Sequence, residues 1–239
     1  MQVVILAAGR GDRFVKAGYT LPKPLILARG LPMVQYAMAQ VRAITDRPVV
    51  LCPDALRYDI WRAAPLDVLP TVIGVSHVQS GAAMTLLAAA AALNEREPVL
   101  VVDCDSVIAP AAMEHFVVFA KAQFAQDVDS AVMCFQPTDD SARYSFVKVM
   151  KDDDVVRIAE KDRISNLATC GAHAFTSWYA LRWAICKMSA EEDTTNGEYY
   201  LAPAHNYVLL SKAFTVAAGE FTAIGTPEQL EAYEATSAH

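Results

Sequence analysis

Short apolar segments alternate with helical segments through the first half of this 239-residue sequence. The expected strands are 3–7, 48–52, 71–75, 98–102 and 130–135, and the expected helices are 32–44, 82–94 and one that starts at Pro110. Strands that are apolar at every position are typical of a parallel sheet covered on both faces. The alternation therefore predicts a three-layer α/β/α fold, Rossmann-like in build, around a mixed, mostly parallel sheet.

The pattern changes in the second half of the chain. Residues 145–150 and 155–158 read as a hairpin, 171–175 as a strand and 179–188 as a helix. The run Thr226-Pro227-Glu228-Gln229 is a capping box that starts a last helix, which ends at about residue 235. The sequence has no repeat and no flexible linker, so we expect one domain over residues 1–239, with 137–175 extending the same sheet.

Charge and composition argue against several classes of protein. A net charge of −7 disfavours nucleic-acid binding. The longest nearly uninterrupted apolar run, 82–93, is shorter than the roughly 20 residues that span a bilayer, and the first residues lack the basic segment of a signal peptide. Five cysteines without a CxxC pair fit reduced thiols, and five scattered histidines fit no metal or triad spacing. We therefore expect a cytoplasmic protein without membrane or nucleic-acid partners.

A glycine loop, Leu6-Ala7-Ala8-Gly9-Arg10-Gly11-Asp12-Arg13-Phe14, follows the first expected strand. Glycines let backbone N–H groups approach phosphate oxygens, although the same run could be a plain strand-to-helix turn. The loop lacks the GK[ST] of a Walker A motif, and Phe14 replaces the third glycine of a dinucleotide fingerprint. The first 30 residues hold five basic residues and one acidic residue, a charge of +4, which predicts a small polyanionic ligand here.

The loop continues into Pro22-Lys23-Pro24-Leu25-Ile26, where two prolines stiffen the backbone around a lysine. Together the two segments resemble the G-x-G-[TS]-R-[LF]…P-K-P signature of the nucleotidyltransferase family that makes nucleotide-activated sugars and related compounds. The form of the signature found here, with Gly18-Tyr19 before the Pro22-Lys23-Pro24 run, is similar to that of family members encoded with surface-polysaccharide genes. Some of those enzymes act on non-sugar phosphates. The family fold is also similar to that of GT-A glycosyltransferases.

The resemblance implies roles for the loop. The nucleotide would be bound by Leu6, Ala7, Ala8, Gly9, Arg10 and Gly11. Arg13 would stabilise the pyrophosphate leaving group, and Lys23 would neutralise charge near the α-phosphate. Asp12 departs from the family, which has Thr or Ser at this position. About 1–136 would then form the nucleotide-binding part and about 137–239 the acceptor-binding part.

The segment Asp103-Cys104-Asp105 follows the expected strand 98–102. Carboxylate oxygens suit Mg²⁺, although the same residues could form a turn or helix cap before Pro110. With the glycine loop present we favour Mg²⁺, and the resemblance implies Asp105 as main ligand and Asp103 as an additional one. The family's second metal acid lies in a W-x-D-x-G-T run, where this sequence has Ala223. We hypothesise that Asp103 supplies the missing carboxylate.

The resemblance also assigns the two substrate sides. Gln79 and Gly81, before the alanine-rich helix, would read the base, and the Gln79 amide suits a pyrimidine edge unless it is a helix cap. Residues that recur in the family's order on the acceptor side are Tyr144, Ser145, Glu160, Lys161, Gly171 and Glu198. Lys161 would bind the acceptor phosphate and Glu160 would accept hydrogen bonds, whereas alone they would read as a surface pair.

The expected reaction joins an NTP to a phosphorylated small molecule and releases pyrophosphate, with Mg²⁺ as cofactor. A sugar 1-phosphate is the leading acceptor, and phosphocholine-like and phospho-amino-acid acceptors stay open, as does a homo-oligomer. The attacking phosphate oxygen is already anionic, so no general base is needed. Two alternatives are a glycosyltransferase that uses the same D-x-D, and a non-catalytic nucleotide-binding regulatory protein, to which Ala223 and Asp12 point.

Overall fold

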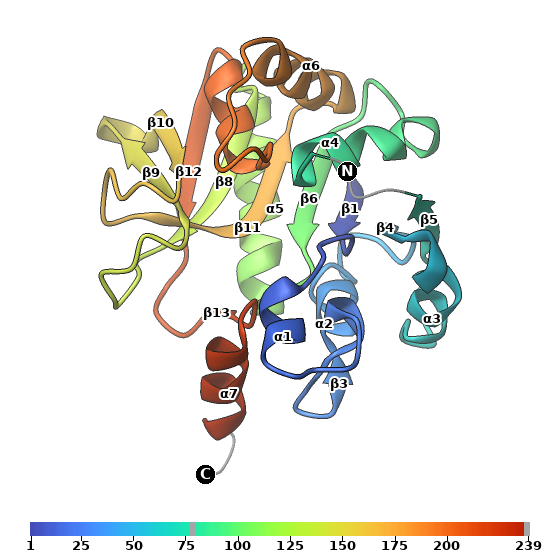
Figure 1. Ribbon diagram of the computed structural model, residues 1–239. Helices are drawn as coiled ribbons and strands as arrows, with labels where there is room; N and C mark the ends of the chain where they lie inside the picture. The colour runs from blue at the N-terminus through green and yellow to red at the C-terminus, as the bar shows by residue number, and fades with distance from the viewer. Residues whose placement is uncertain (77–79, 237–239) are drawn as a thin grey trace.

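The computed structural model describes residues 1–76 and 80–236 around one large sheet. Its strands are β1 (Gln2–Leu6), β4 (Val49–Pro53), β5 (Thr71–Val75), β6 (Val99–Asp103), β8 (Ser130–Phe135), β9 (Ser145–Val149), β10 (Val155–Glu160), β11 (Ala168–Phe175) and β12 (Ser211–Thr215). They run in the order β10-β9-β11-β6-β1-β4-β5, and β8 joins β12 to β11 (Figure 1). The pairs among β6, β1, β4 and β5 are parallel, as is β8 with β12, whereas β11 is antiparallel to its neighbours. The sheet is mixed and mostly parallel, as the sequence predicts.

Helices cover both faces of this sheet. One face carries α2 (Met33–Gln40), α3 (Arg57–Arg62) and α5 (Pro110–Phe124); the other carries α4 (Ala82–Leu86), α6 (Trp178–Ala190) and a 3₁₀ segment, Ala202–Tyr207. In β1, Val3 and Ile5 belong to the apolar cluster on the α5 side, while Val4 and Leu6 belong to the cluster that includes Trp178. This alternation explains why the strand is apolar at every position.

A third apolar cluster holds the smaller elements below the sheet. It joins Phe14 of α1 (Asp12–Lys16) to Leu230 of α7 (Pro227–Ala235) and to Ile224, and α7 lies beside α1 in Figure 1. Two short antiparallel pairs were not predicted: β2 (Leu27–Ala28) with β3 (Leu31–Pro32), and β7 (Ser106–Ile108) with β13 (Phe221–Ala223). The second pair brings the end of the chain to the sheet edge that carries Asp103 and Asp105.

Two predicted helices differ from the structure. The helix expected over 32–44 ends at Gln40, and the one expected over 82–94 becomes α4 followed by a 3₁₀ segment, Leu87–Ala92. Alanine-rich composition favours helical backbone but does not specify the hydrogen-bond period. At α7 the Thr226 hydroxyl accepts from the Gln229 N–H at 3.3 Å, but the Gln229 side chain turns elsewhere, so only half of the capping box forms.

Along the described parts of the chain, no helix has both the length and the apolar character that a bilayer crossing requires.

Candidate active site

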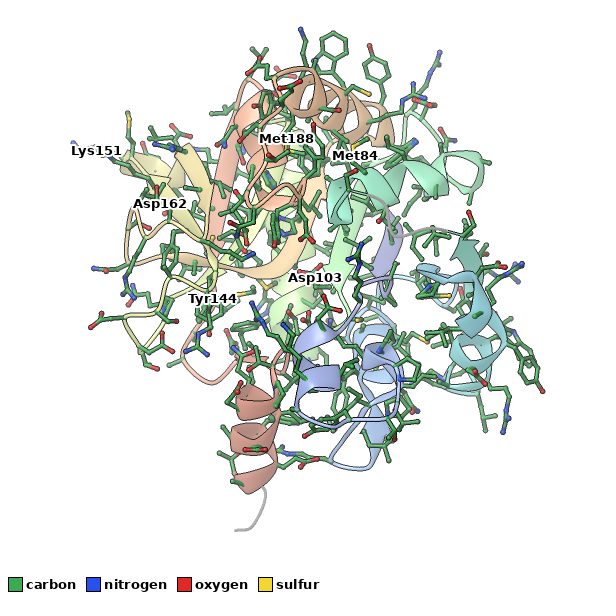
Figure 2. The ribbon with its side chains drawn as sticks, in the orientation of Figure 1. Met84, Asp103, Tyr144, Lys151, Asp162 and Met188 are labelled. Atoms are coloured by element: carbon green, nitrogen blue, oxygen red, sulfur yellow. The ribbon has the colours of Figure 1, made fainter. Side chains whose placement is uncertain are left out.

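Two neighbouring cavities open at the carboxyl ends of β1 and β6. The glycine-loop cavity, about 380 Å³, is lined by the loop after β1 and by the start of α4. The β11 cavity, about 260 Å³, is lined by residues of β9, β10, β11 and α7. Both cavities are lined by Arg13, Lys23, Asp103, Asp105, Tyr200 and Gly225. Figure 2 shows Asp103 near the middle of the molecule, at the end of β6. The expected cations and carboxylates thus form the common boundary of two cavities.

The glycine loop forms one wall of the glycine-loop cavity. The residues Leu6, Ala8, Gly9, Arg10 and Gly11 line the glycine-loop cavity. Ala7 does not: it is fully buried, and its N–H donates to the Leu51 carbonyl at 2.8 Å, so it supports the loop from behind. Gly11 has a φ of +68°, and a Cβ there would lie 2.9 Å from Cβ of Lys23. Glycine at this position lets the loop pack directly against the lysine.

Asp12 and Arg13 begin the short helix α1 after this loop. Both are exposed and both line the glycine-loop cavity. Asp12 lies in the first helical turn, where backbone N–H groups favour an acidic side chain. That position offers a structural reason for the acid that replaces the family's Thr or Ser.

Lys23 is paired with Asp105. Pro22 precedes a 3₁₀ turn, Lys23–Leu25, and Pro24 lies within it, and this turn directs the ammonium to the sheet edge. Its Nζ lies 2.5 Å from Oδ2 of Asp105, and both side chains are partly buried. Burial lowers the pKa of Lys23, but the Asp105 carboxylate outweighs burial and raises it above its ordinary value. Burial likewise acts to raise the pKa of Asp105, and Lys23 reverses this, so that the pKa lies below its usual range. Both groups are charged at neutral pH.

Asp103 is the less compensated carboxylate of the pair. Burial, followed by the nearby Asp105 charge, raises its pKa to about 7. Gly171, with a φ of +77°, lies so close that a Cβ there would be 2.7 Å from Oδ2 of Asp103. Two crowded carboxylates with hard oxygen donors fit a divalent ion such as Mg²⁺, whose charge would relieve their repulsion. Among the described residues, no group of three or more His, Cys, Asp or Glu side chains is arranged for a metal, so such an ion would take its other ligands from water and phosphate.

Ala223 lies beside the acidic pair. It lines the β11 cavity together with both aspartates, and it pairs with Ser106 across β7 and β13. The Ile224 N–H donates to the Asp105 carbonyl at 2.9 Å, which fixes this strand against the acidic pair. A methyl group cannot ligate a metal, so the compensating role of Asp103 remains a prediction.

Most of the predicted acceptor residues line the β11 cavity: Tyr144, Ser145, Glu160, Lys161 and Gly171. The Ser145 hydroxyl donates to Oε2 of Glu160. Burial raises the pKa of Glu160, and the Ser145 hydrogen bond opposes that rise. Lys161 donates from Nζ to the Tyr200 hydroxyl, and its Nζ lies 4.2 Å from the centroid of that ring. Glu198 is exposed and lines the glycine-loop cavity instead, apart from the other five.

The base side is only partly described. Gln79 lies outside the described residues. Gly81 lines the glycine-loop cavity with a φ of +122°, and a Cβ there would lie 2.6 Å from the backbone nitrogen of Tyr199. The start of α4 is therefore packed against the backbone of the segment that carries Tyr200.

Sequence reasoning missed several residues that line the two cavities: Thr85, Arg143, Thr169, Tyr200, Thr226 and Gln229. Tyr200 ends the run Asn196–Tyr200, and Arg143 precedes Tyr144, so proximity to predicted residues was the available signal. Gln229 carried a different signal, because the capping box assigned its side chain to the helix start.

Comparisons with known proteins identify the family and the fold. Residues 3–173 match the family of MobA-like NTP transferase domains. No curated protein matched the sequence. A nucleoside-diphosphate-sugar pyrophosphorylase from Vibrio cholerae superposes with a TM-score of 0.77 at 20% identity, over 98% of this chain and 100% of that one. The inositol-1-phosphate CTP transferase from T. maritima gives 0.77 at 20% identity over 99% and 94%. A UDP-glucose pyrophosphorylase gives 0.77 at 15% identity over 99% and 97%. At these identities the similarity shows the fold.

Proposed function

Since the chain belongs to the family of MobA-like NTP transferase domains, we propose that it transfers a nucleotidyl group from an NTP to a sugar 1-phosphate and releases pyrophosphate. The family makes the chain a nucleotidyltransferase; the acceptor and the metal are our proposal. The observation that supports it is the boundary of two cavities formed by Arg13, Lys23, Asp103 and Asp105. Such a boundary suits a reaction in which two polyanions meet.

In this proposal the NTP lies in the glycine-loop cavity, with its phosphates against the backbone N–H groups of Gly9–Gly11, and the acceptor lies in the β11 cavity. An acceptor phosphate oxygen attacks the α-phosphorus in line. The new oxygen–phosphorus bond forms as the bond from the α-phosphorus to the bridging oxygen breaks, and its electron pair leaves with pyrophosphate. The attacking oxygen carries a negative charge at neutral pH, so the protein needs to position it and not to deprotonate it.

The residues at the boundary reduce the repulsion between the two substrates. Lys23 would neutralise the α-phosphate, and Arg13 the departing pyrophosphate. Asp103 and Asp105 would hold Mg²⁺, which when bound supplies positive charge to the phosphate oxygens. Lys23 lines both cavities, so it can serve the reacting phosphorus from the side of the acceptor.

The lining of the β11 cavity favours a polyol phosphate over a phosphorylated quaternary amine. Hydroxyl groups of Tyr144, Ser145, Thr169 and Tyr200 border it, and Glu160 supplies a carboxylate. An ammonium ligand would need open aromatic faces. The Tyr200 ring is already approached by Lys161, and the guanidinium of Arg143 lies 6.0 Å from the Tyr144 centroid. Structural neighbours named for UDP-glucose and inositol 1-phosphate point in the same direction.

The nucleotide preference rests on the sequence alone. We propose a pyrimidine NTP, because an amide at Gln79 suits a pyrimidine edge.

We also propose that the protein acts in the cytoplasm, where NTPs are available. This location fits the free cysteines, of which Cys52, Cys104, Cys134 and Cys170 are buried.

A pyrophosphate-release screen tests the function. Four NTPs are combined with sugar 1-phosphates, inositol 1-phosphate, phosphocholine and phosphoserine, with and without Mg²⁺. We expect release with a pyrimidine NTP and a sugar 1-phosphate, and at least about a hundredfold less with an Arg13→Gln enzyme. Nucleotide binding without release from any pair would favour a regulatory protein. Release of a nucleoside diphosphate from a nucleotide sugar would favour a glycosyltransferase.

A further inference from the structure

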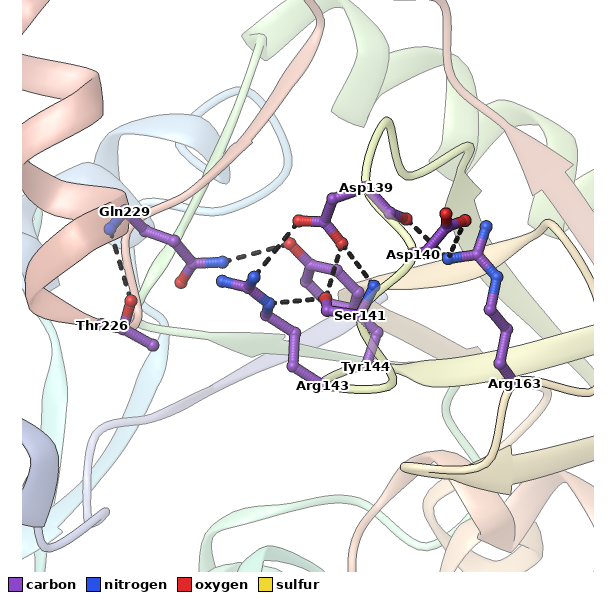
Figure 3. A network of polar contacts seen from close by, with 8 residues as sticks. All are labelled: Asp139, Asp140, Ser141, Arg143, Tyr144, Arg163, Thr226 and Gln229. Carbon is purple, nitrogen blue, oxygen red and sulfur yellow. Dashed lines mark hydrogen bonds and ion pairs between the residues drawn. The ribbon is translucent and has the colours of Figure 1, made fainter.

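The Gln229 side chain connects the last helix to the acceptor side of the site. Its backbone N–H is capped by Thr226, which leaves the side chain free of the helix start. The amide Nε2 donates to the phenolic oxygen of Tyr144 at 3.1 Å, across 85 positions of sequence (Figure 3). Both residues line the β11 cavity. A residue that ordinarily closes a capping box is here directed to a cavity wall.

The Tyr144 ring is fixed by aromatic packing on the protein side. The Phe135 ring meets it edge-on at 5.2 Å between centroids, and Phe146 does so at 6.4 Å. The preceding loop is tied down as well, since Nε of Arg143 donates to the Ser141 hydroxyl at 2.7 Å. Figure 3 shows two sets of contacts side by side: Arg143 with Asp139 and Ser141 in the loop, and Tyr144 with Gln229 of α7. The ring therefore has a set position, and the remaining freedom is the direction of its O–H bond.

Gln229 determines the direction of the O–H bond because Gln229 is the donor in its hydrogen bond with Tyr144. The amide N–H donates, so the Tyr144 oxygen acts as acceptor and its own proton is not used in this bond. Within residues 1–76 and 80–236, no hydrogen bond donated by this phenol to a protein atom is present. Burial raises the pKa of Tyr144, while Arg143 and the Gln229 bond act to lower it. The phenol keeps its proton at neutral pH and can donate it to an oxygen atom in the cavity.

We propose that Gln229 is a positioning residue for acceptor recognition, which holds the Tyr144 phenol so that its O–H donates to an oxygen of the acceptor. The inference rests on the proposed function, because it places the acceptor in the β11 cavity. In this proposal α7 takes part in substrate recognition through Gln229, although the sequence around Gln229 indicates only the start of a helix.

The test reverses the polarity of one hydrogen bond. In Gln229→Glu the carboxylate accepts a hydrogen bond from the Tyr144 hydroxyl, so the phenol can no longer donate to the acceptor substrate. With the NTP and acceptor that the pyrophosphate screen identifies, we expect KM for the acceptor to rise about tenfold, KM for the NTP to stay within about twofold, and kcat to change less than the acceptor KM. Tyr144→Phe should match it, and the double variant should lose no more than either single one. Glu231→Gln, an exposed change on the same helix, should behave as the wild type.

A spectroscopic measurement separates positioning from loss of fold. With tyrosine labelled at ¹³Cζ, the Tyr144 signal is assigned by its absence in Tyr144→Phe. Gln229→Met removes the donor but keeps the side-chain length, and we expect it to raise the pKa that this signal reports, with an unchanged Tm. An acceptor KM unchanged by Gln229→Glu, or a Tyr144 signal unaffected by Gln229→Met, overturns the inference. If the wild type releases no pyrophosphate from any pair, the proposed function itself fails and the inference with it.

Discussion

The ammonium of Lys23 lies 2.5 Å from a carboxylate oxygen of Asp105, although 82 positions separate the two residues. The cation that we assign to the α-phosphate and the carboxylate that we assign to the metal therefore neutralise each other before substrates arrive. Binding of the triphosphate and of the metal must separate this pair. The two binding events should consequently favour one another.

Replacing Lys23 tests this coupling directly. In Lys23→Met the Asp105 carboxylate loses its ion-pair partner, so Mn²⁺ should bind about tenfold more tightly in the absence of nucleotide, as followed by electron paramagnetic resonance. Pyrophosphate release should fall at least about a hundredfold, because the α-phosphate loses its cation. Lys16→Met, a change at an exposed basic residue of α1, is the matched control. Equal Mn²⁺ affinity in Lys23→Met and wild type would contradict the coupling.

Asp103 can be tested by moving its carboxylate. Asp103→Ala should lose nearly all Mg²⁺-dependent turnover, at least about a hundredfold, if it replaces the acid that Ala223 lacks. Because Ala223 lines the same cavity as Asp103 and Asp105, adding Ala223→Asp to that variant should restore part of the activity. Near-normal turnover of the single variant would refute the assignment, and thermal unfolding would show that the protein is folded.

Gly171 offers a test of close packing at the acidic pair. Gly171→Ala would force a Cβ against Oδ2 of Asp103, in a backbone conformation with φ of +77°. We expect the free energy of unfolding to fall by about 2 kcal/mol and Mn²⁺ binding to weaken. Gly219 has a similar φ, +88°, but no atom within 4 Å of an added Cβ. Gly219→Ala should therefore lower the free energy of unfolding by about 1 kcal/mol and leave Mn²⁺ binding unchanged. Calorimetry and metal titration of both variants make the comparison.

Two buried histidines predict a loss of stability in mild acid. His173 Nδ1 and His205 Nε2 are 3.0 Å apart, and His205 Nδ1 lies 2.8 Å from the Ser130 hydroxyl. Burial lowers the pKa of His173 to about 3 and that of His205 well below its ordinary value. A lowered native pKa means that the unfolded chain binds more protons, so stability is full above the unfolded pKa of about 6.5 and is lost as the pH falls below it.

The expected change between pH 7.5 and pH 5.5 is about 1.4 kcal/mol for each histidine, measured by urea unfolding. His173→Gln should reduce the pH dependence to about half, because His205 still contributes. His115→Gln, at an exposed position of α5, should leave it unchanged. A free energy of unfolding that stays constant over this pH range would show that the buried pair does not titrate as described.

The sequence predicted those parts of the molecule that depend on local pattern. The runs 71–75 and 130–135 coincide with β5 and β8. The first five residues of β8 are buried, as expected for a strand covered on both faces, whereas β5 lies at the edge of the sheet and is only partly buried. The glycine loop, Lys23 and the acidic pair were expected to meet because parallel strands end at one edge of a sheet. Because the glycine loop and the acidic pair each directly follow an expected strand, their positions in the sequence were enough to predict their place at that edge.

Contacts between distant short segments were beyond local pattern. Strands β7 and β13 have three residues each, too few to show a period of two, so their pairing was not predicted. The family resemblance indicated only that Ala223 stands at the position of the second metal acid. Gln229 was assigned to its own helix because the sequence does not show that Tyr144 lies across the cavity. Glu198 follows a turn at Gly197, and the direction of its side chain toward the glycine-loop cavity depends on how that turn docks.

The pairing of β7 with β13 also separates the structural dependence of the two cavities. Asp103 and Asp105 lie at the end of β6, while Phe221 and Ala223 reach the β11 cavity from a strand that is distant in sequence and held by β7. A loosening of β13 from β7 would therefore open the acceptor side of the proposed site and leave the loop after β1, which lines the other cavity, in place. The two substrate sides thus depend on different parts of the fold.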